Sequence, residues 1–342
     1  MDRWIDFFAD SPLLAAGALL ASAALVYLAI CVEIARRFTR VHRHRAPPPP
    51  TPELRRASVH LPARDGRARI AAWYLEAAPR QAAVVFVHGK AASRGDELKA
   101  PTLGLAQALR AAGISVLMID LRGHGASSPA RLTYGGRERH DVQGAVDWLV
   151  QRGYAAERIG ILGGSMGAGC ALLAAADATP VAALALDSPY AGFDAMIERQ
   201  FRRLSRGLPH WLLPGALAIA RLWTGVDLRG VRPLAAARAL RGTPMLVVHS
   251  AGDRLVPADD AHAIAQAGGG ELWITESCGH LGSYRHAGLD YERRIVAFFR
   301  AHLAAGGAAG AVGAPRLALP TRGHAAAPTR GAPILPRRGA AR

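Results

Sequence analysis

The sequence predicts an α/β fold: a mostly parallel central sheet with helices on both faces, preceded by one membrane-spanning helix. Short runs rich in Val, Ile and Leu alternate with helical stretches between residues 57 and 303. Such alternation is typical of parallel strands joined by right-handed crossovers. An uncharged apolar segment lies near the N-terminus, and polar or glycine residues follow four of the expected strands, where open α/β sheets carry their sites.

Composition limits the classes of protein that the chain can be. It has 342 residues, 51% apolar and 20% charged, as expected of a folded protein of one or two domains. Three cysteines exclude a disulfide-stapled scaffold. The net charge is +16, but residues 34–56 and 304–342 each contribute +6, which is 12 of the 16 charges. We therefore expect no nucleic-acid partner, because a nucleic-acid-binding domain should carry its basic face on the fold itself.

A membrane-spanning helix is expected over residues 12–33, after a short N-terminal segment, residues 1–11. No residue from Pro12 to Val32 is charged, and twenty helical residues span about 30 Å, the thickness of the hydrocarbon core. The alternatives are a buried core helix and a cleaved signal peptide, but the preceding residues are acidic, unlike a signal peptide. The arginine cluster that follows predicts a single-pass protein of the cell membrane with its large C-terminal domain in the cytoplasm.

Two further segments are expected to lie outside the folded domain. Residues 34–56 are basic and contain four consecutive prolines, which indicates an extended linker. Residues 304–342 are rich in Gly, Ala, Pro and Arg without apolar periodicity, which predicts a disordered basic tail. The folded domain should therefore span residues 57–303.

Eight strands and five helices are expected in this domain, the first two strands as a hairpin. The expected strands are Val59–Leu61, Ile70–Leu75, Ala83–Val87, Ile114–Ile119, Ile159–Leu162, Val181–Leu186, Met245–His249 and Leu272–Ile274. The expected helices are Leu103–Ala112, Glu138–Val150, Ala168–Ala176, Ala258–Gln266 and Asp290–Leu303. Residues 190–242 are longer than an ordinary connection and mix large apolar residues with arginines, so we expect a small helical cap over the site.

Ser165 is the candidate nucleophile. It lies in the run Gly-Gly-Ser-Met-Gly (163–167), between an apolar strand and a helix of small residues. A Gly-x-Ser-x-Gly run in this position is typical of a nucleophile elbow, whose strained turn exposes the serine hydroxyl above the sheet. The helix N-terminus beside it favours negative charge. A phosphate-binding glycine loop is the alternative.

His280 is the candidate general base, and Asp253 is the carboxylate that orients it. Each follows an expected strand in the C-terminal part of the chain. Serine, acid and histidine follow one another in this order along the chain in one known class of catalytic triad. The rival residues are Asp187, Asp227, Asp259 and Asp260 for the acid, His249 and His286 for the base, and Cys278 for the nucleophile. We expect Cys278 to be a small buried thiol, because it lacks an elbow.

Two backbone N–H groups are candidate donors to an oxyanion, those of Lys90 and Met166. A His-Gly-Lys run (88–90) follows the expected strand Ala83–Val87, and Met166 follows Ser165. Such donors stabilise the charge that develops in acyl transfer. We expect His88 to hold the loop, and residues 120–127 to form a turn whose polar side chains bind loop backbone.

Together these motifs resemble the α/β-hydrolase superfamily, and within it the serine-aminopeptidase-like (acylaminoacyl-peptidase-like) hydrolases. The resemblance covers residues 59–303 and rests on His-Gly at 88–89, the turn at 120–127, Gly-Gly-Ser-Met-Gly at 163–167, Asp-Ser-Pro at 187–189, Gly-Asp at 252–253 and Gly-His at 279–280. It implies the α/β-hydrolase fold, a triad of Ser165, Asp253 and His280, and no metal or organic cofactor. Lys90 departs from the pattern, since many relatives carry an aromatic or small polar residue there.

The implied reaction is acyl transfer to water through an acyl-enzyme. We expect an esterase or thioesterase acting on a small-molecule or lipid-like acyl substrate, with the membrane as the protein's other partner. The alternatives are a serine peptidase or aminopeptidase, and a non-catalytic binding protein with a hydrolase fold.

Overall fold

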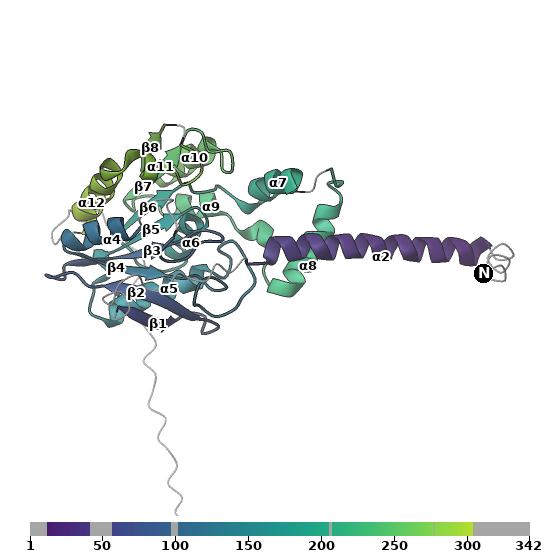
Figure 1. The fold of residues 1–342 in the computed structure, drawn as a ribbon, viewed down its shortest axis with the longest axis horizontal. Coiled ribbons are helices and arrows are strands. Elements are labelled where there is room, and N and C mark those ends of the chain that lie inside the picture. Colours follow the sequence, from purple (N-terminus) through teal and green to yellow (C-terminus); the bar gives the residue numbers. More distant parts are fainter. Residues whose placement is uncertain (1–11, 42–56, 97–101, 205–206, 277, 304–342) are drawn as a thin grey trace, which may run out of the picture. The chain divides into compact units, whose positions relative to one another are not determined.

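The computed structural model describes residues 12–41, 57–96, 102–204, 207–276 and 278–303. The expected N-terminal segment, most of the linker and the expected tail lie outside these residues. The described chain forms one eight-stranded sheet with helices on both faces (Figure 1), which confirms the predicted fold class.

The strands follow one another in the sheet in the order β1-β2-β4-β3-β5-β6-β7-β8. Their bounds are β1 (Ser58–Pro62), β2 (Arg69–Leu75), β3 (Ala82–Val87), β4 (Ile114–Ile119), β5 (Ile159–Gly164), β6 (Ala183–Asp187), β7 (Met245–Ser250) and β8 (Glu271–Thr275). Strand β1 pairs antiparallel with β2, and β2 pairs antiparallel with β4. Every other pairing in the sheet, from β4 through β3 to β8, is parallel. Strands β3 to β7 are buried throughout, because helices cover both faces.

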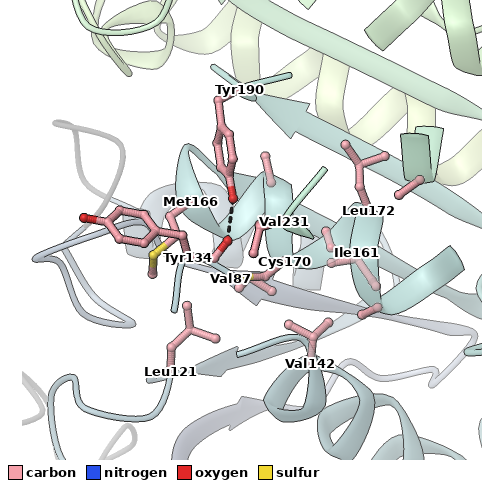
Figure 2. Close-up of a cluster of buried hydrophobic side chains, with 14 of the residues drawn as sticks. Val87, Leu121, Tyr134, Val142, Ile161, Met166, Cys170, Leu172, Tyr190 and Val231 are labelled. Atoms are coloured by element: carbon pink, nitrogen blue, oxygen red, sulfur yellow. Dashed lines mark hydrogen bonds between the residues drawn. The ribbon is translucent and has the colours of Figure 1, made fainter. Parts of the chain in front are cut away.

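The helices of the sheet form two layers. Their bounds are α4 (Thr102–Ala111), α5 (Arg139–Gln151), α6 (Met166–Ala176), α10 (Ala258–Gly268), α11 (Ser283–Ala287) and α12 (Leu289–Leu303). Helices α5, α6 and α10 bury apolar side chains in one core, and α4 and α12 bury theirs in a second core across the sheet. Figure 2 shows part of the first core, with Val142 of α5 and Cys170 of α6. All five expected helices and all eight expected strands are present within two residues of their predicted bounds.

The N-terminal helix α2 (Pro12–Thr39) continues six residues past its expected end at residue 33. It is long and apolar enough to cross a membrane, and its 18-residue apolar window, with mean hydropathy 2.3, has no buried residue. Beyond that window Cys31, Ile34, Ala35 and Phe38 are buried in the first core. The helix is therefore extended by packing against the domain, which a reading of hydropathy does not detect.

The segment between β6 and β7 contains α7 (Phe193–Leu204), α8 (Leu212–Thr224) and α9 (Pro233–Ala239). Helix α9 packs against α6 and α10, so it belongs to the layer on the sheet. Helix α8 instead packs along α2 (Figure 1), where the Cys31 thiol donates to the Leu212 carbonyl at 3.5 Å. The part of the expected cap (190–242) that stands apart from the sheet is therefore α7 and α8.

A buried arginine holds the turn that follows β4. Arg122 is 3% exposed, and its guanidinium donates to Asp141 on α5 at 2.8 Å and to Asp65 in the β1–β2 turn at 2.9 and 3.0 Å. Burial lowers the pKa of Arg122, but these two carboxylates outweigh it and raise the pKa above its ordinary value. The ion pairs of Arg122 thus join three separate segments of the chain.

We expect Arg122→Met to lower the free energy of unfolding by about 3–5 kcal/mol, because it leaves two carboxylates without their buried partner. The matched control is Arg293→Met, whose ion pair with Asp290 is exposed on α12; it should cost less than about 1 kcal/mol. Chemical denaturation of the two variants measures the difference. Equal losses would contradict the role of the buried pair.

Candidate active site

Ser165 lies in the tight turn between β5 and α6. Its backbone has φ +50° and ψ −115°, a strained conformation for a residue with a side chain. The turn requires small neighbours, since a Cβ on Gly167 would lie 2.2 Å from the Val87 carbonyl oxygen and one on Gly163 would lie 2.6 Å from that of Gly167. Strand and helix can meet this closely only at glycine, and their approach fixes the direction of the serine side chain.

His280 connects Ser165 to Asp253. Its Nε2 lies 2.8 Å from the Ser165 Oγ, and its Nδ1 lies 2.6 Å from the Asp253 Oδ2. A carboxylate only accepts, so Nδ1–H is the donor to Asp253, which leaves Nε2 to accept the serine proton. The structure therefore brings together the three side chains that the sequence singled out, from loops that follow three different strands.

The buried Asp253 carboxylate is held on both oxygens. Its Oδ1 accepts from the backbone N–H of Leu255 at 2.8 Å and of Val256 at 3.0 Å, while Oδ2 accepts from His280. Burial raises the pKa of Asp253, but the hydrogen bonds from His280 and the two amides outweigh it, so the pKa lies below its ordinary value. The carboxylate is thus charged and fixed opposite the imidazole.

The rival residues have other partners. His249 is buried beside Asp253, with its Nε2 3.0 Å from the Val256 carbonyl oxygen and 3.5 Å from the Asp253 Oδ2. His286 makes an exposed contact with Glu276, and the Cys278 thiol contacts the Thr275 hydroxyl. Asp260 accepts from the Ala191 N–H and from Arg199, and Asp227 accepts from the Arg229 N–H. None of these contacts joins a rival to Ser165.

Asp187 supports the loop that carries His280. Its carboxylate is fully buried at the end of β6 and accepts from the Tyr291 hydroxyl and the Ser188 hydroxyl, each at 2.9 Å. The Ser188 Oγ in turn accepts from the N–H of Leu281, next to His280, at 3.3 Å. Burial raises the pKa of Asp187 to about 6, although both hydroxyl donors oppose it. The Asp-Ser-Pro motif was noted in the sequence, but this support role was not predicted.

Two neutral histidines hold the loop that carries Lys90. The buried His88 accepts from the Leu121 N–H through Nε2 at 3.0 Å, so its Nδ1–H donates to the Gly89 carbonyl at 2.7 Å. His124 Nε2 accepts from the Ala91 N–H at 3.4 Å. Burial, with His124 nearby, lowers the pKa of His88 to about 4, so the loop is held without charge. His88 thus has the structural role expected of it.

The two candidate oxyanion donors lie at the start of α6 and in this loop. Met166 is the first residue of α6, in the turn whose N–H groups lack intrahelical acceptors. Lys90 precedes Ala91, whose φ of +60° turns the backbone sharply after β3. The ammonium of Lys90 donates to the Tyr134 hydroxyl at 3.1 Å.

Tyr134, which is buried and contacts Lys90, is a residue that sequence reasoning missed. Its hydroxyl also donates to the Phe38 carbonyl at 3.1 Å, which joins the end of α2 to Lys90. The buried Glu138 carboxylate holds the turn around it by accepting from the N–H of Thr133 and of Gly135, each at 2.8 Å. Figure 2 shows Tyr134 in the first core, where its carbonyl accepts from the Tyr190 hydroxyl. The only sequence signal was a pair of glycines followed by a glutamate.

The arrangement can accept a hydroxyl proton at His280 and balance the resulting imidazolium with Asp253. Within the described ranges, no group of three or more His, Cys, Asp or Glu side chains is placed to hold a metal ion.

Three comparisons with known proteins are informative. A family model described as serine aminopeptidase, S33, matches residues 78–226. The uncharacterized protein YqkD of Bacillus subtilis (strain 168) is 34% identical over 191 residues, which span 54% of this chain and 62% of YqkD. The chain thus matches less than two thirds of that relative's length.

Solved structures share the fold. The Pyrococcus furiosus esterase Pf2001 has a TM-score of 0.62 at 22% identity, over 78% of this chain and 99% of the esterase. A puromycin-hydrolyzing peptidase of Mycobacterium tuberculosis has a TM-score of 0.55 at 19% identity, over 72% of this chain and 40% of the peptidase. With the sheet order and the strand-to-helix turn at Ser165, these matches show that the chain has the α/β-hydrolase fold.

Proposed function

We propose that this chain is a membrane-anchored serine hydrolase that cleaves an acyl ester or a related carboxylic acid derivative. The observation that carries the proposal is the position of His280, hydrogen-bonded to Ser165 on one side and to Asp253 on the other. The strained backbone of Ser165 supports it, because such a turn presents the hydroxyl of a nucleophile. The anchor in this proposal is α2, with the hydrolase domain on the cytoplasmic side.

The proposed reaction has two acyl transfers. His280 Nε2 takes the proton of Ser165 as the serine oxygen attacks the substrate carbonyl, and the N–H groups of Lys90 and Met166 stabilise the oxyanion. The imidazolium then gives its proton to the leaving alcohol, which departs and leaves an ester on Ser165. Water attacks this ester with His280 as base, and the carboxylic acid is released.

We expect a fluorophosphonate probe to label Ser165 in the full-length protein in detergent micelles. The label should be lost in Ser165→Ala and His280→Ala, because the first removes the nucleophile and the second the base that activates it. Cys278→Ala is the matched control near the site and should label normally. The adduct is located by mass spectrometry of peptides. A folded protein without label would favour the non-catalytic alternative.

Asp253→Asn should lower kcat by about 10⁴-fold, as loss of the orienting carboxylate does in other serine hydrolases. The Leu255 and Val256 amides would hold the asparagine oxygen, so its NH₂ would face His280 Nδ1. The imidazole would then carry its proton on Nε2 and could not accept that of Ser165. The exposed Asp259→Asn is the control, and an equal effect on both variants would argue against the assignment.

A peptidase is the second candidate, because the matched family model is described as a serine aminopeptidase and one structural neighbour hydrolyzes puromycin. We expect kcat/KM for a p-nitrophenyl ester of a short fatty acid to exceed that for an aminoacyl p-nitroanilide. Both products are followed by absorbance with the same enzyme preparation. Equal or faster turnover of the anilide would reverse the assignment in favour of the peptidase.

A further inference from the structure

An apolar groove runs between α2 and the α7–α8 hairpin. It has a volume of about 380 Å³, within the range of about 300–1,000 Å³ that is typical of ligand pockets. Its apolar lining consists of Ala29, Ile30, Ile34 and Phe38 on α2, with Phe201 and Leu208 opposite. Ser165, His280 and Asp253 are not among the residues that line it.

The α2 side of the groove is one continuous face of the helix. The lining positions recur at intervals of four residues from 30 to 34 and from 34 to 38, so they stack on the same side. From Ala29 to Phe38 the face is about 14 Å long. Its first part continues the exposed apolar surface of the helix, and its last part ends among the buried residues of the domain.

Aromatic and charged side chains mark the level at which the groove leaves the apolar part of α2. Tyr27 stacks on Trp211 of the cap with ring centroids 5.6 Å apart, and Trp211 is 63% exposed. Such amphipathic rings favour the boundary between hydrocarbon and headgroups. Glu33 and Arg37, which also line the groove, are paired at 2.7 Å and belong on the aqueous side of that boundary.

The inner end of the groove lies near the proposed oxyanion loop. Phe38 lines the groove, and its carbonyl accepts from the Tyr134 hydroxyl. That hydroxyl accepts from the ammonium of Lys90, whose backbone N–H is a proposed oxyanion donor. Phe193 of α7 packs on Tyr134, with ring centroids 4.6 Å apart. Two hydrogen bonds therefore separate the wall of the groove from the loop beside Ser165.

We propose that this groove holds the acyl chain of an ester drawn from the bilayer, with the tail against α2 and the carbonyl end toward Lys90. The substrate class of the hydrolase is then a lipid with a long acyl chain; this rests on the proposed function. A bilayer lipid is favoured because one wall of the groove is the proposed membrane-spanning helix itself. A chain lying beside α2 enters the groove without leaving apolar surroundings.

The test compares p-nitrophenyl palmitate with p-nitrophenyl butyrate on the full-length protein in phosphatidylcholine nanodiscs. Ala29→Phe adds a phenyl group to the lining of the groove, and Ala24→Phe adds the same group to an exposed position of α2 outside it. We expect Ala29→Phe to lower kcat/KM for palmitate about tenfold, since excluding even two methylene groups has that effect. Butyrate turnover should not change, and Ala24→Phe should affect neither ester.

A second readout does not depend on catalysis. Ser165→Ala protein is placed in the same nanodiscs with a phosphatidylcholine that carries a photoreactive group on its acyl chain. Irradiation should cross-link the lipid to the peptide that contains Phe201, and adding Ala29→Phe, but not Ala24→Phe, should abolish that cross-link.

The outcomes separate the two proposals. An unlabelled Ser165 with no ester hydrolysis overturns the proposed function. Serine-dependent hydrolysis with equal effects of Ala29→Phe on both esters, or a cross-link that Ala29→Phe leaves intact, overturns only the lipid groove.

Discussion

The close approach of strand β5 to helix α6 is the constraint on which the site depends. Gly163 and Gly167 let the two backbones meet, and the turn between them leaves Ser165 in a conformation that costs about 1–3 kcal/mol. The surrounding sheet supplies that energy, because β5 is buried between β3 and β6 and cannot relax outward. The rest of the site is arranged around a serine whose direction is already fixed.

Buried polar groups, more than apolar contacts, position the loops around that serine. His88 and His124 hold the Lys90 loop as neutral acceptors and donors, while Asp187 holds the His280 loop through Ser188. Buried polar networks of this kind are costly when one member is missing, since the remaining groups stay unpaired in a low-dielectric interior. They therefore specify one loop geometry where apolar packing alone would accept several.

The fold and the candidate site residues could be predicted from the sequence for a physical reason. Strands buried on both faces are short apolar runs, and their carboxyl ends carry the polar residues, so Ser165, Asp253 and His280 were each recognisable beside a strand. Contacts between distant segments were not recognisable. The sequence predicts a membrane-spanning helix for α2 and a cap for α8, but composition does not reveal that the two helices pack together. Tyr134 was missed for the same reason: its partners, Phe38 and Lys90, are far away in the chain.

The contacts between α2 and the domain make the C-terminal part of this helix a part of the domain's core. The Thr39 carbonyl accepts from the Leu132 N–H at 2.8 Å, and Cys31, Ile34 and Phe38 belong to the same core as Met166. Helix and domain thus share one hydrophobic core, and the helix is not merely a flexible attachment to a separate domain. A fragment that begins after the helix would expose the face of α8 that α2 covers and would lose two carbonyl acceptors. If such a fragment is insoluble or inactive, the opened core explains it, and the result says nothing about the chemistry of the intact chain.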